Sequence, residues 1–429
     1  MQEAYKTIND YLTIPRSQHG IRLKELCPHA SEVVKDLQDA GFEAYIVGGS
    51  VRDLLLGKAP KDFDVATSAT PEEVQDVFPR CRLIGRRFRL AHLRKAGHLI
   101  EVATFRGQAT PGGDDDHELD NGRILRDNVF GSLEEDALRR DFTINALFLD
   151  PVSGEIRDYV GGYQDLADRS LRLIGDPEVR YREDPVRLLR AARFEAKLGV
   201  EPEEKTGAAI PKLAGLLKDV PPARLFEEVN KLFLTGHGMR SMEALQRFGL
   251  SQDLFPALPK GSGKGKVRIG ILLRKTLENT DKRVRESLPV TPAFLFAALL
   301  WEPVRDRAGE LEKSGESPYM AIMAASEEAI ASQVKRTAIP RRYSAVTRQI
   351  WLMQARFGKT RGKRWKRLLY EQRFRAGYDF LLLRAEEDPE LEPLCEFWTE
   401  AQKGVQLPRP GDRNRNRNDR RRPRKRRRA

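Results

Sequence analysis

A glycine pair between a short apolar strand and a helix, followed closely by a strand carrying two aspartates, constrains this chain most. Residues 42–47 (FEAYIV) have the composition of a buried strand, Gly48-Gly49 follow at once, and VRDLLL continues at helical spacing. Ser50 stands three residues before Asp53, which predicts a capping box at the start of this helix. KDFDVAT then predicts a second strand, so the N-terminal half should hold a mixed α and β unit.

Asp62 and Asp64 lie two residues apart on the second predicted strand. Their side chains should share one face while Phe63 points to the opposite, buried face. Convergent carboxylates suit Mg²⁺, which prefers oxygen ligands and commonly takes one or two protein carboxylates beside substrate phosphates. The alternative interpretation is two surface acids on a half-buried strand.

The glycine turn, thirteen residues before Asp62, favours the metal interpretation. Free backbone amides at a helix N-terminus attract anions, glycine lets a phosphate approach the backbone, and Arg52 adds charge-assisted hydrogen bonds. A tight capped turn is the alternative. A phosphate cradle beside paired carboxylates predicts nucleotidyl transfer.

Two further motifs supply candidate residues. Asp141, in Arg139–Ala146 (RRDFTINA), is either a helix cap or a third carboxylate, and Glu101 on the strand IEVATF is its rival. In Glu183–Arg190 (EDPVRLLR), Asp184 suits an N-cap, but Asp184, Arg187 and Arg190 step by three and so share one helix face. Such a face can read the edge of a nucleobase.

The charge of the chain is concentrated at its C-terminus. Residues 408–429 hold twelve basic and two acidic residues and account for most of the net charge of +13 over 429 residues, which predicts a disordered tail and a polyanionic partner. Residues 356–375 add nine basic residues among four aromatic ones, a composition that suits single-stranded RNA or a basic helix with buried aromatic rings. The three cysteines lie far apart and no apolar run reaches the length of a transmembrane helix, so we expect a protein of the reducing cytoplasm.

The rest of the chain divides by its pattern. Residues 82–105 predict a hairpin with its turn at Ala96-Gly97, a second hairpin surrounds residues 151–154, and residues 108–121 predict an acidic loop. Beyond Gly162 the pattern is helical.

The segments GGSVRD, KDFDVAT, RRDFTINAL and REDPVRLLRAARF, in this order, resemble the class II template-independent nucleotidyltransferases. This family includes bacterial poly(A) polymerases and tRNA CCA-adding enzymes. The segments CRLIGRRFRLAHL, PPARLFEE and PAFLFAALLW and the basic tail resemble the poly(A)-adding members. The resemblance implies an α+β fold with a polymerase-β-like head, a small mixed sheet, all-helical neck and body domains, and a disordered basic tail.

The domain boundaries that we expect are an N-terminal extension over residues 1–30, a head over 31–165, a neck over 166–250, a body over 251–407 and the tail over 408–429.

The resemblance also implies an activity and a set of residue roles. The activity is transfer of AMP from ATP to the 3′-hydroxyl of single-stranded RNA with release of pyrophosphate, which would promote RNA turnover, with RNA-decay proteins as partners through the tail. The cofactor is Mg²⁺, as two ions. The implied roles are metal binding for Asp62 and Asp64, catalysis for these two and Asp141, nucleotide binding for Gly48, Gly49, Arg52, Arg140, Asp184, Arg187 and Arg190, and RNA binding for Arg356, Lys363, Arg364, Lys366 and Arg367.

Two other functions stay open at this point. A CCA-adding enzyme shares every head motif, and a non-catalytic RNA-binding protein could be built on a degenerate head. Intact Asp62, Asp64 and Arg187 argue against the second alternative.

Overall fold

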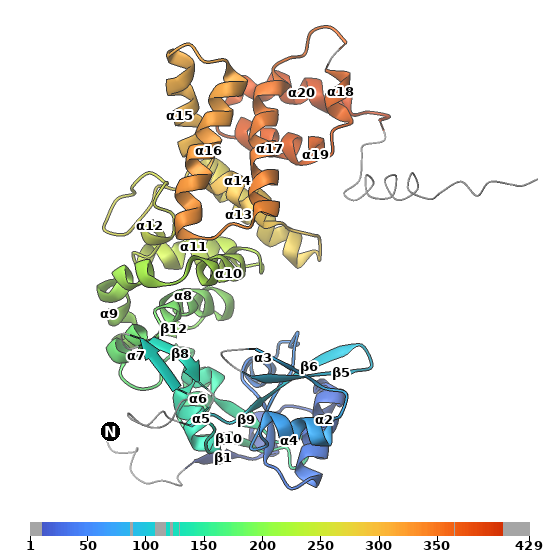
Figure 1. The fold of residues 1–429 in the computed structure, drawn as a ribbon, viewed down its shortest axis with the longest axis vertical. Helices are drawn as coiled ribbons and strands as arrows, with labels where there is room; N and C mark the ends of the chain where they lie inside the picture. The colour runs from blue at the N-terminus through green and yellow to red at the C-terminus, as the bar shows by residue number, and fades with distance from the viewer. Residues whose placement is uncertain are drawn as a thin grey trace, which may run out of the picture. The chain divides into compact units, whose positions relative to one another are not determined.

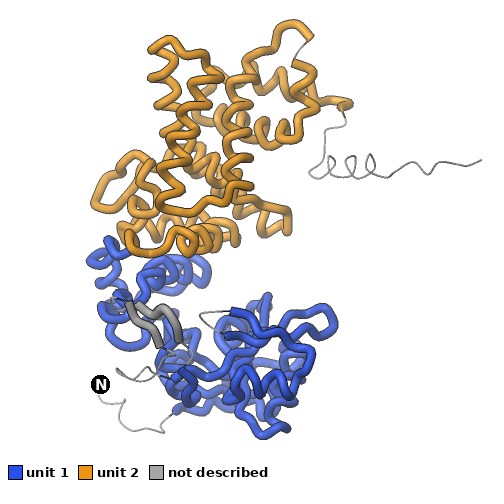
Figure 2. Tube along the Cα trace, viewed as in Figure 1, with its two compact units in different colours: residues 1–216 blue, residues 217–429 orange. Residues whose placement is uncertain are grey.

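The computed structural model describes residues 11–85, 89–107, 129–363 and 365–405, together with the backbone of 117–120 and 123–127. It divides into two compact units, residues 1–216 and 217–429 (Figure 2). The first unit carries the strands and the second is helical (Figure 1). The expected α+β class is therefore confirmed. Separately, no helix among the described residues is both long and apolar enough to cross a bilayer.

The head contains a mixed sheet of eight strands among the described residues. Most neighbours are antiparallel, but β3 and β6 run parallel. In spatial order the strands are β1 (Leu12–Ile14), β10 (Ile156–Asp158), β9 (Leu147–Leu149), β2 (Ala44–Val47), β3 (Asp64–Thr67), β6 (His98–Thr104), β5 (Leu90–Lys95) and β4 (Arg82–Ile84).

Shorter elements complete the first unit. Two small pairings lie outside the main sheet, β7 (His117–Asp120) with β8 (Arg123–Asp127) and β11 (Ser170–Leu171) with β12 (Glu201–Pro202). The helices are α1 (Arg16–His19), η1 (Leu23–Glu25), α2 (Pro28–Asp39), α3 (Gly49–Leu55), α4 (Pro71–Val77), α5 (Leu133–Arg139), η2 (Thr143–Asn145), α6 (Gly162–Ala167), α7 (Pro177–Glu183), α8 (Val186–Leu198), α9 (Glu204–Leu213) and η3 (Ala214–Asp219), the last of which crosses the boundary between the units.

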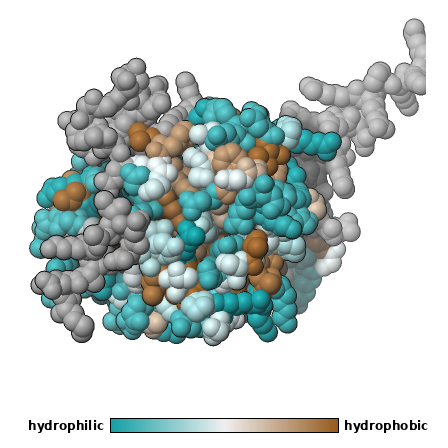
Figure 3. Space-filling view, turned by 90° about the horizontal axis from the view of Figure 1, so that it is seen from below, coloured by the Kyte–Doolittle hydropathy of each residue, from teal (hydrophilic) through white to brown (hydrophobic). Residues whose placement is uncertain are grey.

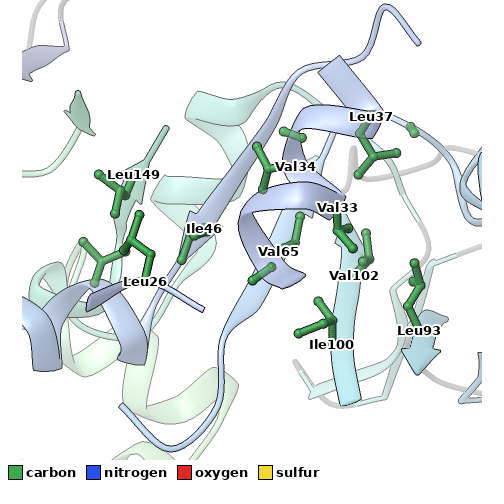
Figure 4. Close-up of a cluster of buried hydrophobic side chains, with 14 of the residues drawn as sticks. Leu26, Val33, Val34, Leu37, Ile46, Val65, Leu93, Ile100, Val102 and Leu149 are labelled. Carbon is green, nitrogen blue, oxygen red and sulfur yellow. The ribbon is translucent and has the colours of Figure 1, made fainter. Parts of the chain in front are cut away.

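Helix α2 covers one face of the sheet because its Val33, Val34 and Leu37 are fully buried at helical spacing. They pack against inward-facing residues of the central strands, as Figure 4 shows for Val65 and Val102. Alternate residues of the same strands face the opposite side, where Tyr45, Val47 and Ala66 pack with residues of α5.

The second unit consists of helices, most of them joined by short connections, with a longer one over residues 255–270. They are α10 (Pro222–Phe233), α11 (Gly238–Arg247), α12 (Ser251–Leu254), α13 (Ile271–Arg285), α14 (Pro292–Leu299), α15 (Trp301–Lys313), α16 (Pro318–Arg336), α17 (Arg341–Phe357), α18 (Lys366–Leu369), α19 (Phe374–Ala385), η4 (Pro389–Leu391) and α20 (Glu392–Ala401). The apolar run at 293–301 lies across α14 and the start of α15, and its residues are buried except for Phe294.

Local predictions succeeded where the signal lies within a few residues. The turn at Ala96-Gly97 joins β5 to β6 with positive φ at both residues, and β9 and β10 form the second hairpin. The sequence Thr70-Pro71-Glu72-Glu73 also predicts a capped helix start, and Thr70 caps α4 with reciprocal bonds to Glu73.

Two predictions were wrong, and one segment expected to lie outside the head pairs with its sheet. The expected capping box at Ser50 does not form, because the Ser50 hydroxyl donates to the carbonyl of Val47 and Gly48 is the N-cap. Residues 117–120 lie in strand β7 and not in a loop, because they pair with β8. Residues 12–14, assigned to a separate extension, form an edge strand of the head sheet by pairing with β10.

The other expected boundaries are not tested by this division, since the described chain separates once, within the segment assigned to the neck. The tail at 408–429 and residues 108–116 lie outside the described residues.

Candidate active site

One row of register partners runs across the head sheet and carries the candidate carboxylates. Val47 on β2 pairs with Asp64 on β3, Asp64 pairs with Glu101 on β6, and Glu101 pairs with His92 on β5. Register partners on adjacent strands project from the same face of a sheet. Asp64 and Glu101 therefore lie side by side, on the face opposite to the α2 core.

Asp64 is under electrostatic strain at this position. Partial burial raises the pKa of the Asp64 carboxyl to about 6, and the negative charges of Glu101 and Asp62 act in the same direction, while Arg140 opposes them. The two neighbouring carboxylates contribute to this shift after burial, and a bound divalent cation would relieve their repulsion.

Asp62 lies just before β3, because the strand begins at Asp64 and is shorter than KDFDVAT suggested. Phe63 packs against the α2 core, as predicted. Among the described residues, no group of three or more His, Cys, Asp or Glu side chains is gathered as a ready ligand set. Glu101 instead contacts His92, with 3.4 Å between its Oε1 and the imidazole Nε2. Two aspartates beside substrate phosphates still match the oxygen ligands that Mg²⁺ takes.

The glycine turn lies next to this row. Gly48 has φ of 71° and ψ of −127°, a conformation that favours glycine, and a Cβ there would lie 3.4 Å from Nη1 of Arg140. Arg140 is held by Asp136, which accepts bonds of 3.1 and 2.8 Å from Nε and Nη2, and its guanidinium lies 4.9 Å from the Phe148 ring centroid. The turn, Arg140 and Asp64 therefore form one neighbourhood.

Arg52 lies deeper than expected. Its side chain is 4% exposed, its Nε and Nη2 donate to Asp53 Oδ1 at 2.8 and 2.6 Å, and its Nη1 donates to Asn145 Oδ1 at 2.5 Å. These contacts fix the guanidinium beneath the start of α3, and Nη2 lies 3.4 Å from the position of a Cβ on Gly49.

Asp141 lies in a different environment from Asp64. Its Oδ2 accepts a bond of 2.6 Å from Arg190 Nε, and its Oδ1 accepts bonds from the Phe142 amide at 2.8 Å and from Asn145 Nδ2 at 3.0 Å. Although burial opposes it, the charge of Arg190 together with these bonds lowers the pKa of Asp141 to about 2. The structure therefore places Glu101, and not Asp141, beside Asp64.

The candidate base-reading motif spans the junction of α7 and α8. The Asp184 carboxylate accepts from the Val186 amide at 3.3 Å, so it helps to start α8. Arg187 donates through Nη1 to the Arg180 carbonyl at 2.7 Å and to Glu183 at 3.1 Å, while Arg190 turns to Asp141. The two arginines therefore have different acidic partners, and reading of a nucleobase by this face stays a prediction.

The candidate RNA-binding residues of the body separate into two groups. Arg356 is paired with Glu371, and Phe357 and Phe374 are fully buried, so these residues stabilise the fold. Tyr370, at the end of α18 beside Lys366 and Arg367, is 61% exposed. Lys363 precedes α18, and Arg364 lies outside the described residues.

Two residues of the site were missed from the sequence. His92 could be placed beside Glu101 only from the strand register, and no local pattern marks Asn145, whose partners come from α3 and from Asp141.

On the face drawn in Figure 3, hydrophobic residues are interspersed with hydrophilic ones.

Comparison with known proteins matches three segments of the chain to family models. Residues 44–172 match the "Poly A polymerase head domain", residues 199–260 the "Probable RNA and SrmB-binding site of polymerase A", and residues 314–429 the "Polymerase A arginine-rich C-terminus".

Whole-chain relatives agree with these matches. The chain is 47% identical over 409 residues to poly(A) polymerase I of Salmonella typhi, covering 94% of this chain and 88% of that protein. A CCA-adding enzyme of Lactobacillus helveticus is 41% identical, but over only 57% of this chain and 58% of its own. Among solved structures, the CCA-adding enzyme of Bacillus stearothermophilus in complex with CTP is similar with a TM-score of 0.58 and 25% identity, covering 88% of this chain and 83% of that one.

Proposed function

We propose a residue-level mechanism from the premise that this chain belongs to the bacterial poly(A) polymerase I family and is a template-independent poly(A) polymerase. The reaction joins the α-phosphate of ATP to the 3′-hydroxyl of RNA and releases pyrophosphate. The mechanism rests on the row of register partners across the sheet. In this row Asp64 lies between Val47, which the glycine turn follows directly, and Glu101.

The metal site is assigned to Asp62 and Asp64, with Glu101 as the third carboxylate. These residues fit Mg²⁺ because they supply only oxygen atoms and because Glu101 and Asp62 place negative charge beside Asp64 that a divalent cation would neutralise. When bound, Mg²⁺ supplies charge stabilisation for the transferred phosphoryl group and the leaving pyrophosphate. We assign Asp141 a positioning role instead, since its carboxylate is saturated by Arg190, Asn145 and the Phe142 amide.

The nucleotide lies, in this proposal, between the glycine turn and α8. The backbone of Gly48 and Gly49 and the guanidinium of Arg140 face the phosphates, since the glycines follow Val47, the register partner of Asp64, and Arg140 acts on the Asp64 carboxyl. Asp184 and Arg187 at the start of α8 read the adenine edge, because a carboxylate and a guanidinium together present an acceptor and donors. Arg52 and Arg190 support these contacts from the buried side.

The RNA partner is single-stranded and enters with a free 3′ end. In the body, the exposed Tyr370 can stack on a base while Lys363, Lys366 and Arg367 neutralise phosphates. The Arg-rich tail adds sequence-independent attraction. Association with RNA-decay proteins through this tail, and a cytoplasmic location, belong to the same proposal.

A substrate comparison tests the function. Purified protein is incubated with Mg²⁺ and either an unrelated single-stranded RNA or a tRNA lacking its CCA end, with ATP or CTP supplied separately. Long A tails on both RNAs with ATP alone are expected. C addition followed by a single A, confined to the tRNA, would instead identify a CCA-adding enzyme.

The third carboxylate is tested by comparing Glu101→Gln with Asp141→Asn. If Glu101 acts beside Asp64, Glu101→Gln lowers kcat and raises the Mg²⁺ concentration needed for half-maximal activity. Asp141→Asn should leave that Mg²⁺ requirement unchanged while weakening ATP binding. The reverse pattern would return the third-carboxylate role to Asp141.

A further inference from the structure

An unbroken chain of polar contacts joins the glycine turn of the head to helix α8. Arg52 Nη1 donates to Asn145 Oδ1 at 2.5 Å, Asn145 Nδ2 donates to Asp141 Oδ1 at 3.0 Å, and Arg190 Nε donates to Asp141 Oδ2 at 2.6 Å. We call this chain of four side chains the relay. It connects residues that are far apart in sequence and that lie on α3, on η2 and its preceding turn, and on α8.

One aromatic ring lies against the arginines at both ends of the relay. The guanidinium carbons of Arg52 and Arg190 lie 5.2 and 5.1 Å from the centroid of the Phe194 ring. Phe194 itself packs edge-on against Phe142, with 5.6 Å between the ring centroids. The two cations are therefore held by polar contacts on one side and by a common ring on the other.

Asn145 is the one member whose side chain offers both a donor and an acceptor. An amide can accept from a guanidinium and donate to a carboxylate at the same time, and only one orientation of the amide satisfies both neighbours. An aspartate here would lose the donor and face the Asp141 carboxylate, whereas an alanine would lose both contacts. Asn145 is 7% exposed, so water cannot readily replace either bond.

The backbone of Asn145 is fixed as well. It ends the 3₁₀ turn η2, whose Thr143 hydroxyl donates to Asp165 Oδ2 at 2.7 Å. Gly162 packs directly on this turn, since a Cβ there would lie 2.1 Å from the Thr143 carbonyl oxygen. The Asn145 carbonyl also accepts from Arg140 Nη1 at 3.3 Å, so the same residue contacts the phosphate-facing arginine.

We propose that Asn145 is a positioning residue that sets the spacing between the phosphate-binding turn and the base-reading helix through the relay. The inference rests on the proposed function, in which the turn holds the triphosphate and the start of α8 reads the adenine. Loss of the relay should therefore weaken ATP binding and reduce discrimination against CTP, while the Mg²⁺ requirement stays unchanged because the relay does not include Asp64 or Glu101.

The test compares Asn145→Ala, Asn145→Asp, Asp141→Asn and the exchanged double variant Asp141→Asn with Asn145→Asp. The exchange keeps the net charge and a hydrogen bond between positions 141 and 145, with donor and acceptor reversed, and leaves an acceptor for Arg52. Each single variant should lower kcat/KM for ATP by about ten- to one-hundred-fold, the range expected for losing a hydrogen bond to a charged group. The exchange should recover at least part of that loss relative to Asn145→Asp.

Thr104→Val is the matched control for general destabilisation. Thr104 is buried to a similar degree and its hydroxyl donates to the Ala69 carbonyl at 2.7 Å, but it lies on the α2 side of the sheet, opposite to Asp64. It should lower the melting temperature without changing the ratio of kcat/KM for ATP to that for CTP.

ATP binding by the same variants in the absence of RNA, followed by calorimetry, gives a readout independent of turnover. Wild-type protein that makes no A tails would contradict the proposed function itself. Active wild-type protein whose Asn145→Ala variant keeps the wild-type ATP affinity and ATP to CTP ratio would overturn the relay. An exchanged variant no better than Asn145→Asp would overturn it as well.

Discussion

Replacing Asp64 by asparagine should stabilise the metal-free protein while it destroys activity. In the folded protein the pKa of Asp64 is about 6, against an ordinary value of 3.8. The folded state therefore binds this proton more tightly than the unfolded state, and the free energy of unfolding falls as the pH rises from about 4 to about 6. Above pH 6 the ionised carboxylate lowers the stability by its full amount, and asparagine removes that penalty.

The magnitude follows from the same difference in pKa. It corresponds to about 3 kcal/mol for a fully desolvated group. Part of the Asp64 side chain is exposed to solvent, and screening reduces the value to about 1 kcal/mol. For a unit of this size we expect Asp64→Asn to raise the melting temperature by about 2–4 °C at pH 8, and by about half as much at pH 5, where the folded wild type is mostly protonated.

The assay is thermal unfolding in EDTA at the two pH values, repeated with Mg²⁺. Magnesium should raise the melting temperature of the wild type, because it binds only the folded state, and should have little effect on the variant. Asp76→Asn, which changes an exposed carboxylate on α4, is the matched control and should shift neither curve. A variant no more stable than wild type at pH 8, or equally stabilised at both pH values, would refute the reasoning.

Three further predictions concern substrates. Arg187→Ala should lower the ratio of kcat/KM for ATP to that for CTP by about ten-fold, whereas Arg140→Ala, which removes a phosphate contact and no side chain of the relay, should depress both nucleotides alike; equal ratios in the two variants would contradict base reading by Arg187. Tyr370→Ala should weaken binding of single-stranded RNA by about 1–3 kcal/mol in a fluorescence titration, with Tyr370→Phe as the control that keeps the ring. Deleting residues 411–429 should flatten the slope of log affinity for RNA against log salt without changing kcat at saturating RNA; an unchanged slope would mean that the tail contacts something else.

How far the sequence predicted this site depended on the range of each interaction. The glycine turn at Gly48 and the cap at Thr70 are determined by neighbouring residues, and their positions were predicted correctly. The pairing of Asp64 with Glu101 joins parallel strands separated by α4 and two further strands, and a shift of one residue would turn Glu101 to the other face. No local pattern contains that register.

Asp141 is a second residue whose contacts the local sequence does not predict. Its carboxylate looked equally suited to a metal ligand or a cap in the sequence, and the choice depended on Arg190, a residue of α8. Ser50 and Asp53 had the correct spacing for a capping box, but Arg52 took the Asp53 carboxylate for a buried contact of its own. Tertiary partners decided each of these cases.

Strand β1 gives the head an unusual order of assembly. It is the first strand of the described sheet to leave the ribosome, yet its partner β10 is the last, since Ile14 pairs with Ile156. During synthesis β1 can pair with β10 only after most of the head has been made. Until the two strands pair, the edge of β10 is free to form hydrogen bonds with strands of other chains. A recombinant head that begins at residue 31 would keep that edge open permanently and should aggregate, so its N-terminus belongs before Leu12.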